Sequence, residues 1–419
     1  MPISFNEEFN AFEGTVLFDE ILDGFDFSVF GGIISIEGAV ISPILANSHQ
    51  GIEIWNAAGG VISSGGSLFA IELLGNGGRN IFNDGTISGS VRFGNGWDSF
   101  FNSGLVTGQI KTGNGNDLVT NQMIPGIDGG PFTAGTIMGT IDTGAGDDTV
   151  LNSGIVNDVK LGSGNDTYTV GGFISEVFGD EIMSAESGDV RGQAGNDTIS
   201  GGEADENFFG GSGDDLLVGN GGRDNLQGGS GNDEVFGGAG NDKITGGNGM
   251  DTLFGGENND AINGGGDDDI ISGGEGNDKL TGANGNDLMF GDAGNDHIVG
   301  SSGSDTLEGG AGRDTLIGGA DDDVFVFRGN TEADTINDFR TGDRIDLYFS
   351  GEGFITYDDV IANTQFASGD AVIHLSDLFD TYGFGDSSDH GSILTLRNVD
   401  AADLTADAFG LYNDFLLVG

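Results

Sequence analysis

A nine-residue repeat runs from Gly192 to Val326 without an insertion or deletion and divides this stretch into fifteen consecutive units. The sixth position is Asp in fourteen units and Glu in the other, and the eighth position is apolar in all fifteen. A fixed period of this kind is typical of a solenoid, in which one unit cannot bury its apolar face alone. A disordered or elastic Gly/Asp-rich linker, the alternative, has no reason to keep phase. The repeat therefore predicts stacked units.

Each unit combines a tight turn with a short strand, as in GGAGNDKIT from Gly237 to Thr245. Glycines at positions one, two and four permit positive φ values and let backbone carbonyls converge without Cβ atoms in the way. The Asp at position six adds a carboxylate, and a set of oxygen ligands suits a hard cation such as Ca²⁺. Positions seven to nine predict a short strand whose central apolar residue points inward. Two units then form one coil of a stack.

The charge of the chain favours a fold that depends on a cation. The 419 residues include 68 Asp and Glu against 13 Lys and Arg, for a formal net charge of -55. Such a chain repels itself and tends toward disorder unless cations neutralise it. The same charge excludes nucleic acid as a natural partner, because phosphate binding needs clustered Lys and Arg. The chain has no Cys, so disulfides and thiolate metal sites are also excluded.

The motif GGxGxDxUx resembles the calcium-binding nonapeptide of the repeats-in-toxin (RTX, haemolysin-type) proteins, over about 135 residues of this chain. The resemblance implies a parallel β-roll that binds several Ca²⁺ ions between turns two units apart. Weaker or reshaped sites are expected where units depart from the motif, at Ala204 and Glu206, at Asn258 and at Asp267. The candidate Ca²⁺ ligands are the sixth-position aspartates Asp197, Asp215, Asp224, Asp233, Asp242, Asp251, Asp260, Asp269, Asp278, Asp287, Asp296, Asp305, Asp314 and Asp323.

A related pattern with twice the period lies upstream of the array. Four GxGxD turns, separated by 19, 31 and 18 residues, end at Asp98, Asp117, Asp148 and Asp166. Similar text brackets each turn and places an Asn at matching positions, namely Asn83, Asn102, Asn121 and Asn152. These features predict coils of a parallel β-solenoid, 18 to 19 residues long, with a ladder of stacked Asn amides. The four aspartates are further Ca²⁺ candidates, and turns with an N-cap-like Asp are the alternative.

The repeats divide the chain into four predicted segments. These are an N-terminal cap over 1–45, a parallel β-solenoid over 46–191, an RTX β-roll over 192–326, and a small β-rich C-terminal cap over 327–419. An insert near 121–133 explains the 31-residue interval, and a surface loop is favoured there over a recognition element. The apolar run over 29–46 contains Glu37 and Pro43, so it indicates buried strand and no transmembrane segment. The predicted fold class is all-β.

The C-terminal segment resembles parts of exported proteins. DTINDFRTGDRIDL is similar to the module that follows the repeats in secreted serralysin-type proteases. SILTLRNVDAADLTADAF and the final DFLLVG look similar to the uncleaved region read by type I secretion machinery. The N-terminus lacks the basic and continuous apolar regions of a secretory signal peptide. Together these features imply a secreted protein. Asp334, Asp338 and Asp343 are candidates for a further Ca²⁺, but a solvated acidic loop is the favoured interpretation.

No catalytic motif is evident. The four His are scattered, no HExxH motif exists, which excludes a serralysin-like protease, and no GxSxG motif exists, which argues against a lipase of that type. The sequence therefore favours a non-enzymatic β-solenoid that folds on Ca²⁺ outside the cell and serves in a surface layer, matrix or adhesion. Its further partners would be copies of itself, as a homo-oligomer or filament, or cell-surface polysaccharide.

Two alternatives stay open at this point. The first is a carbohydrate-active enzyme, lyase-like or epimerase-like, on the N-terminal solenoid. The second is a soluble module that binds a glycan or ice through a flat ladder of aromatic or Thr side chains. Trp55, Phe82 and Phe101 are short hints of such a ladder, but they fit a core equally well.

Overall fold

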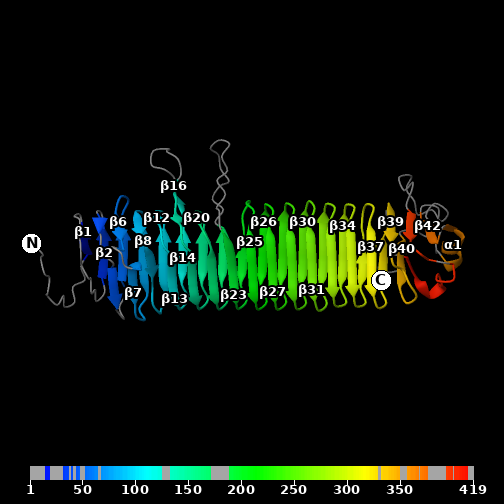
Figure 1. Ribbon diagram of the computed structural model, residues 1–419, viewed down its shortest axis with the longest axis horizontal. Helices are drawn as coiled ribbons and strands as arrows, with labels where there is room; N and C mark the ends of the chain where they lie inside the picture. Colours follow the sequence, from blue (N-terminus) through cyan, green and yellow to red (C-terminus); the bar gives the residue numbers. More distant parts are fainter. Residues whose placement is uncertain are drawn as a thin grey trace, which may run out of the picture. The chain divides into compact units, whose positions relative to one another are not determined.

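The computed structural model describes residues 15–18, 32–36, 39–40, 44–47, 52–64, 68–124, 133–170, 188–328, 332–349, 356–367, 369–375, 393–399 and 401–413. The chain divides into two compact units, Met1–Ser212 (unit 1) and Gly213–Gly419 (unit 2). Each unit is a parallel β-solenoid (Figure 1), which confirms the predicted fold class. The division into four segments stays a prediction.

Unit 1 winds around three parallel sheets. The first sheet contains β1 (Thr15–Phe18), β2 (Gly32–Ile36), β5 (Ile52–Asn56), β8 (Arg79–Asn83), β11 (Asp98–Asn102), β14 (Leu118–Asn121), β19 (Thr149–Asn152), β22 (Thr167–Val170) and β24 (Thr198–Ser200). The second contains β4 (Ile44–Asn47), β7 (Phe69–Leu74), β10 (Ser90–Arg92), β13 (Ile110–Asn114), β18 (Ile141–Ala145), β21 (Val159–Ser163), β23 (Asp189–Ala194) and β25 (Asn207–Ser212). The third, with very short strands, contains β3 (Ala39–Val40), β6 (Val61–Ser63), β9 (Thr86–Ser88), β12 (Leu105–Val106), β17 (Thr136–Ile137) and β20 (Ile155–Val156).

A buried ladder of Asn amides runs through unit 1, as predicted. Each Nδ2 donates to Oδ1 of the Asn one coil later, at 2.7 to 2.9 Å, along the series Asn56, Asn83, Asn102, Asn121 and Asn152. All five side chains are at most 1% exposed. The parallel register places these residues opposite one another in neighbouring strands. The side-chain amide of each Asn can therefore hydrogen-bond to the amide of the Asn in the next coil.

Breaking this ladder in the middle is expected to destabilise unit 1. Asn102→Ala removes the acceptor of Asn83 and the donor to Asn121, so we expect a loss of roughly 1–3 kcal/mol in the free energy of unfolding. Urea unfolding in calcium-saturated buffer, followed by Trp fluorescence, measures this, because Trp55 and Trp97 are the two Trp of the chain.

Asn95→Ala is the matched control for this measurement. Asn95 belongs to an exposed amide ladder, donating to Asn76 at 3.2 Å and accepting from Asn114 at 2.7 Å. Water replaces these partners when the side chain is removed, so the loss is expected to be smaller. Equal losses for the two variants would contradict a special contribution of the buried ladder.

A short antiparallel pair lies where the insert is predicted. β15 (Met123–Ile124) pairs with β16 (Thr133–Ala134), with Met123 opposite Ala134. Residues 125–132 between these strands are outside the described residues. A second interval of 31 residues, from Asp166 to Asp197, contains residues 171–187, which are also outside them. The role of the insert stays a prediction.

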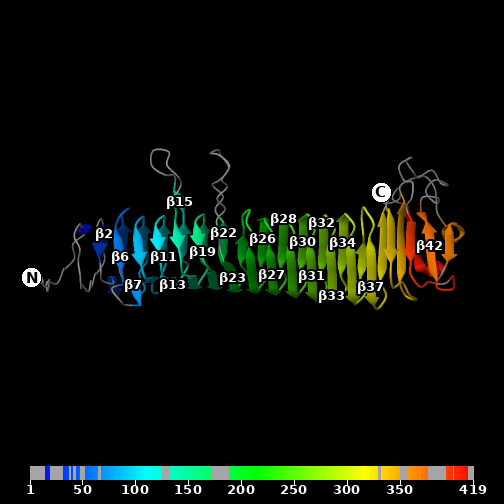
Figure 2. The same cartoon turned by 45° about the horizontal axis from the view of Figure 1, so that its top comes forward.

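In unit 2 the chain alternates between two parallel sheets (Figure 2). One contains β26 (Leu216–Gly221), β28 (Glu234–Ala239), β30 (Thr252–Glu257), β32 (Ile270–Glu275), β34 (Leu288–Ala293), β36 (Thr306–Glu308), β38 (Val324–Arg328), β40 (Arg344–Phe349) and β44 (Phe409–Asn413). The other contains β27 (Asn225–Ser230), β29 (Lys243–Asn248), β31 (Ala261–Gly266), β33 (Lys279–Asn284), β35 (His297–Ser302), β37 (Thr315–Ala320), β39 (Ala333–Ile336) and β43 (Ile393–Leu396).

The strands of the array are longer than the sequence predicts. β29, for example, has six residues, which are positions seven to nine of one unit and positions one to three of the next. Its residues pair in parallel with those 18 positions later, as Lys243 does with Ala261. The prediction of strands limited to positions seven to nine is therefore wrong, because the Gly-rich segment continues the extended backbone and the hydrogen-bonded pairing.

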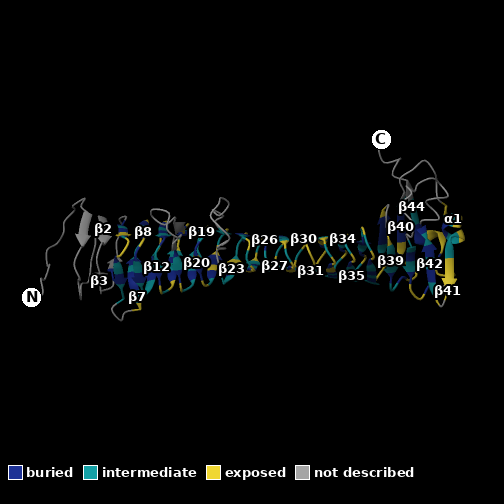
Figure 3. Ribbon diagram, turned by 90° about the horizontal axis from the view of Figure 1, so that it is seen from above, coloured by how far each residue is buried: buried dark blue, intermediate teal, exposed yellow. Residues whose placement is uncertain are grey.

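The core of the array consists of one apolar eighth-position residue from each nonapeptide, stacked from coil to coil. Every eighth-position side chain is at most 2% exposed, as predicted. Figure 3 shows the exposed residues, in yellow, at the turns between β26 and β35. The buried eighth-position residues in unit 2 are Leu217, Leu226, Val235, Ile244, Leu253, Ile262, Ile271, Leu280, Met289, Ile298, Leu307, Leu316 and Phe325. Stacking the coils therefore buries what a single unit cannot.

Parallel pairing continues beyond the array toward the C-terminus. β39 pairs with β37, β40 with β38, and β44 with β40. A short helix, α1 (Tyr357–Ala362), begins at a capping box formed by Thr356 and Asp359. β41 (Thr364–Ala367) and β42 (Asp370–His374) then form an antiparallel sheet with β43, and the 3₁₀ turn η2 (Ala406–Ala408) precedes β44. Within the described part of the chain, no helix is long and apolar enough to cross a membrane.

Candidate functional site

Two ladders of buried aspartates run through unit 2, each joining alternate turns. In the first ladder the backbone N–H of each sixth-position Asp donates to Oδ1 of the Asp 18 residues later at 2.8 to 3.0 Å, through Asp215, Asp233, Asp251, Asp269, Asp287, Asp305 and Asp323. In the second the same bond measures 2.7 to 2.9 Å, through Asp224, Asp242, Asp260, Asp278, Asp296 and Asp314. All these side chains are at most 3% exposed. The backbone thus fixes one oxygen of each carboxylate.

The second carboxylate oxygen is buried and has no hydrogen-bond donor among the described residues. This holds for Oδ2 of Asp233, Asp251, Asp260, Asp269, Asp278, Asp287, Asp296, Asp305 and Asp314. Burial raises the pKa of Asp269 to about 7, and the neighbouring carboxylates of Asp251 and Asp287 add to the rise, against a hydrogen bond from the backbone of Asp251. A row of buried, unpaired carboxylates needs a positive charge near neutral pH.

The position-one glycines leave space beside these oxygens. A Cβ added to Gly264 would lie 2.2 Å from Oδ2 of Asp269 and 2.9 Å from the carbonyl oxygen of Gly282 in the next coil. Gly219, Gly237, Gly255 and Gly291 have equivalent neighbours. Carboxylate and backbone carbonyl oxygens are ligands that Ca²⁺ prefers. No group of three or more His, Asp or Glu that could hold a metal ion occurs in the described ranges. The residues present fit a hard cation.

Filling one of these spaces is expected to damage the site locally. Gly264→Ala places a methyl group 2.2 Å from Oδ2 of Asp269, so we expect at least one Ca²⁺ ion fewer per chain in equilibrium dialysis and a lower melting temperature. Gly266→Ala is the matched control, because its Cβ would meet nothing closer than 3.8 Å. Unchanged calcium binding by the Gly264 variant would contradict a role of this space in binding the ion.

Units that depart from the motif at position four keep the ladder hydrogen bonds. Asn258 and Asp267, at position four, have φ of 76° and 75°, in the left-handed region that Asn and Asp tolerate better than most residues. The ladder bonds to Asp260 and Asp269 stay at 2.7 and 2.8 Å. These φ values are nonetheless smaller than those of the position-four glycines Gly240 (134°), Gly249 (114°) and Gly276 (143°), and weaker calcium sites at these turns stay a prediction. Glu206 stands in place of the sixth-position Asp in the second nonapeptide, which belongs to unit 1 of the fold. It is 3% exposed and accepts a hydrogen bond from the N–H of Gly202 at 3.3 Å.

The four upstream aspartates form a ladder of the same kind in unit 1. The backbone N–H of each donates to Oδ1 of the next at 2.7 to 2.8 Å, through Asp98, Asp117, Asp148, Asp166 and Asp197. Position one, however, holds a buried larger side chain in place of glycine, in the order Phe93, Thr112, Thr143 and Leu161. The upstream ladder thus shares the hydrogen bonds of the array but lacks the space that glycine provides.

The two Asp ladders of unit 2 extend beyond the array. Asp334 and Asp343 are 1% and 4% exposed, and each Oδ1 accepts a backbone N–H, from Asp314 at 2.9 Å and from Asp323 at 3.1 Å. The interpretation as a solvated acidic loop is therefore wrong for both. The signal was present in the sequence as DTI and DRI, which match positions six to eight. The match is easily missed because Asp334 and Asp343 follow Asp314 and Asp323 by 20 residues, whereas ladder partners within the array are 18 residues apart.

Asp338 has a different role from these two residues. Its carboxylate accepts the backbone N–H groups of Gly318 and Gly319 at 3.0 and 2.9 Å, and it is half-buried. A carboxylate bonded to two successive backbone donors stabilises the turn that carries it. Asp338 therefore binds the backbone of the last nonapeptide unit and does not join a ladder.

Parallel coils with ordered aspartate ladders define the β-roll class of calcium-binding solenoid. The family profile described as "RTX calcium-binding nonapeptide repeat (4 copies)" matches overlapping stretches at residues 184–217, 218–253, 245–280, 263–298, 290–325 and 299–336. This part of the chain therefore carries RTX calcium-binding nonapeptide repeats. Such repeats are typical of extracellular proteins exported by type I secretion.

Two solved structures are similar in part. An extracellular lipase, LipA from Serratia marcescens, is 15% identical over 54% of this chain, with a TM-score of 0.23. The AlgE6R3 subunit of a mannuronan C5-epimerase from Azotobacter vinelandii is 27% identical over 36% of this chain and 78% of its own, with a TM-score of 0.24. The chain spans 45% of the length of the lipase. A comparison with curated proteins found no match.

Proposed function

We propose that this protein is a secreted, non-enzymatic β-solenoid that folds when it binds Ca²⁺ outside the cell and then serves a structural role in a surface layer, matrix or adhesive contact. The observation that carries the proposal is the pair of buried Asp ladders in which Oδ2 of nine aspartates, Asp233, Asp251, Asp260, Asp269, Asp278, Asp287, Asp296, Asp305 and Asp314, has no donor among the described residues. The proposed ligands are the sixth-position aspartates from Asp197 to Asp323 together with backbone carbonyls of neighbouring coils.

The proposed mechanism couples export to folding. In a cytosol with little calcium, repulsion among the carboxylates of a chain with net charge -55 opposes stacking of the coils. Outside, Ca²⁺ supplies the positive charge that the buried ladders need, and because it binds the folded form it stabilises that form by mass action. The position-six carboxylates and the position-one glycines are this chain's contribution. The resemblance of the C-terminal segment to a serralysin-type module and a type I secretion signal supports export by that route.

A calcium titration followed by imaging tests the proposal. Far-UV circular dichroism of the metal-free chain should gain a β signal on addition of Ca²⁺, should not gain it with Mg²⁺, and should lose it with EDTA. Electron microscopy of the calcium-loaded protein should then show filaments or sheets. A complete β signal in EDTA would show that folding does not depend on calcium. Dispersed monomers in the electron micrographs would argue against the structural role.

The aromatic residues of unit 1 support a binding module less well. Trp55 and Phe82 stack at 4.1 Å and 18°, and Phe82 and Phe101 at 4.9 Å and 4°, on the outer face of the first sheet. Trp55 is 44% exposed and Phe82 and Phe101 are half-buried, so these side chains are not core residues. Because the rings stack on each other from coil to coil, they cover each other's faces and present edges to solvent. A sugar packs on ring faces, so this stack gives little support for a glycan platform.

A depression in unit 1 supports the alternative of an enzymatic activity on carbohydrate. It has a volume of about 350 Å³ and is lined by Arg92, Lys111 and Asp142, with Asn76 and Asn95 beside them. Its charges are largely paired, Lys111 with Asp142 at 3.0 Å and Arg92 with Glu72 at 3.2 Å. Incubation with uronate polymers, followed by the ultraviolet absorbance of unsaturated products, tests for a lyase. Activity that Lys111→Ala abolishes would establish this candidate.

A further inference from the structure

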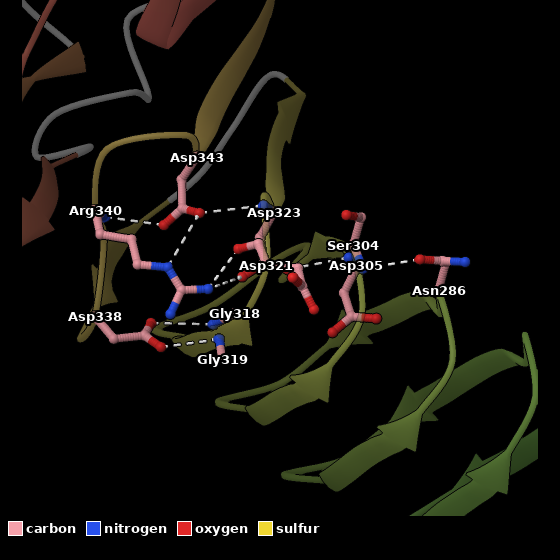
Figure 4. Close-up of polar contacts among 10 residues, drawn as sticks. All are labelled: Asn286, Ser304, Asp305, Gly318, Gly319, Asp321, Asp323, Asp338, Arg340 and Asp343. Carbon is pink, nitrogen blue, oxygen red and sulfur yellow. Dashed lines mark hydrogen bonds and ion pairs between the residues drawn. The ribbon is translucent and has the colours of Figure 1, made fainter.

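The last step of the first ladder in unit 2 differs from the steps before it. Arg340 lies between the final two aspartates (Figure 4), with Nη2 3.7 Å from Oδ2 of Asp323 and Nε 3.9 Å from Oδ1 of Asp343. Nη2 also donates to the carbonyl oxygen of Asp321, and the backbone N–H of Arg340 donates to Oδ2 of Asp343 at 2.9 Å. The guanidinium therefore forms an ion pair, at a distance longer than a hydrogen bond, with Oδ2 of Asp323, the atom that lacks a donor at the interior steps.

The first step of the ladder in unit 1 has the same property. Arg79 is the register partner of Asp98 and so stands in the ladder one coil before the first Asp. Its Nη1 lies 3.3 Å from both Oδ1 and Oδ2 of Asp98, and both side chains are fully buried. A buried cation that pairs with both oxygens of a buried carboxylate offsets part of the cost of burying that charge, and breaking such a pair is strongly destabilising.

We propose that Arg79 and Arg340 are resident cations that take the place of Ca²⁺ at one end of a ladder in each unit. The inference rests on the proposed function, in that the interior steps bind calcium. At each end the guanidinium meets the kinds of oxygen that the interior steps offer. At Arg340 these are two carboxylates from successive turns and one backbone carbonyl. The step between Asp323 and Asp343 then needs no metal ion, and Asp98 is not a calcium ligand.

Removing the resident cation should create a requirement for calcium at that end. In EDTA, hydrogen exchange of the wild-type chain should show β38 and β40 protected while β28 to β34 exchange. Arg340→Met should lose the protection of β38 and β40 in EDTA and regain it when Ca²⁺ is added. Equilibrium dialysis should then find one more Ca²⁺ per chain than in the wild type.

Two further variants separate charge from packing. Arg340→Lys keeps the positive charge, so it should keep most of the protection in EDTA and bind no additional ion. Arg328→Met is the control, because Arg328 is exposed, pairs with Glu308 at 3.1 Å and stacks on Tyr348 without touching a ladder. It should change neither calcium binding nor protection in EDTA.

The ladder in unit 1 is tested by calcium stoichiometry. Asp98→Asn should leave the number of bound Ca²⁺ ions unchanged, whereas Asp269→Asn should lower it. In EDTA, Arg79→Met should expose β8 and β11 to exchange.

These outcomes distinguish the inference from the proposed function. A wild-type chain that binds no Ca²⁺ would defeat the proposed function. A wild-type chain that binds Ca²⁺, with an Arg340→Met variant that binds no additional ion or stays unprotected at saturating Ca²⁺, would overturn the inference alone. Loss of an ion in Asp98→Asn would do the same for Arg79.

Discussion

Metal-free protein at about pH 5 is expected to regain most of the β signal that it lacks at about pH 8. Burial raises the pKa of Asp233, Asp260, Asp269 and Asp296 to about 7 and of Asp251 and Asp305 to about 6, from an ordinary value of 3.8. Protons then take over the role of the cation, because a neutral carboxyl group can be buried at a much smaller cost in free energy than a carboxylate.

Acid pH stabilises the metal-free fold because its buried carboxyl groups are protonated there. The folded, metal-free form holds these protons up to a higher pH than the unfolded chain does, so it binds more protons between the two pKa values. Stability from these groups is therefore fully present below 3.8 and is lost as the pH rises through about 6 to 7. The reverse holds with calcium, which competes with protons for the same oxygens, so calcium binding should weaken on acidification.

Circular dichroism of EDTA-treated protein across this pH range measures the effect, with analytical ultracentrifugation to exclude aggregation. High salt at about pH 8 is the control, because salt screens buried charges much less than exposed ones and should recover little signal. A metal-free chain that stays unfolded at both pH values would show that carboxylate charge is not what opposes folding.

Neutralising two interior ladder residues is expected to have opposite effects with and without calcium. In the double variant Asp251→Asn and Asp269→Asn, Oδ1 still accepts the ladder hydrogen bond, and an amide replaces the unpaired Oδ2. We expect the loss of at least two Ca²⁺ ions per chain. In EDTA we expect a gain of roughly 1–3 kcal/mol per site in stability, since a buried unpaired charge is replaced by a neutral amide.

The matched control changes exposed aspartates at position five of the same edge. Asp214 and Asp268 each accept one backbone N–H, from Asn232 at 2.8 Å and Asn286 at 2.6 Å, but they are exposed. Replacing both with Asn removes the same charge and should change calcium stoichiometry and metal-free stability little. Similar effects in the two double variants would mean that net charge matters and the ladder does not. Equilibrium dialysis and thermal unfolding in EDTA measure both quantities.

The sequence predicts the repeating part of this protein well because its signal is periodic. Phase determines which residues are buried, so the eighth-position core, the parallel stacking and the Asn ladder from Asn83 to Asn152 follow from spacing alone. Spacing also finds the sixth-position aspartates. It misses Asp334 and Asp343, because two additional residues per repeat break the phase although DTI and DRI keep the pattern.

The tertiary structure alone decides what surrounds each carboxylate. From the sequence, the glycines at positions one and two look equivalent. In unit 2 the position-one glycine leaves space beside Oδ2, as at Gly264, whereas the position-two glycine adopts a positive φ, as at Gly265. The sequence also treats Asp98 as one more ladder residue, whereas Arg79 pairs with it. The physical reason is that periodicity reports which face of a strand a residue occupies, while the contacts of a buried charge depend on residues a full coil away. Sequence by itself thus determined the solenoid and its ladders, and only the fold decided which carboxylates the chain leaves unpaired.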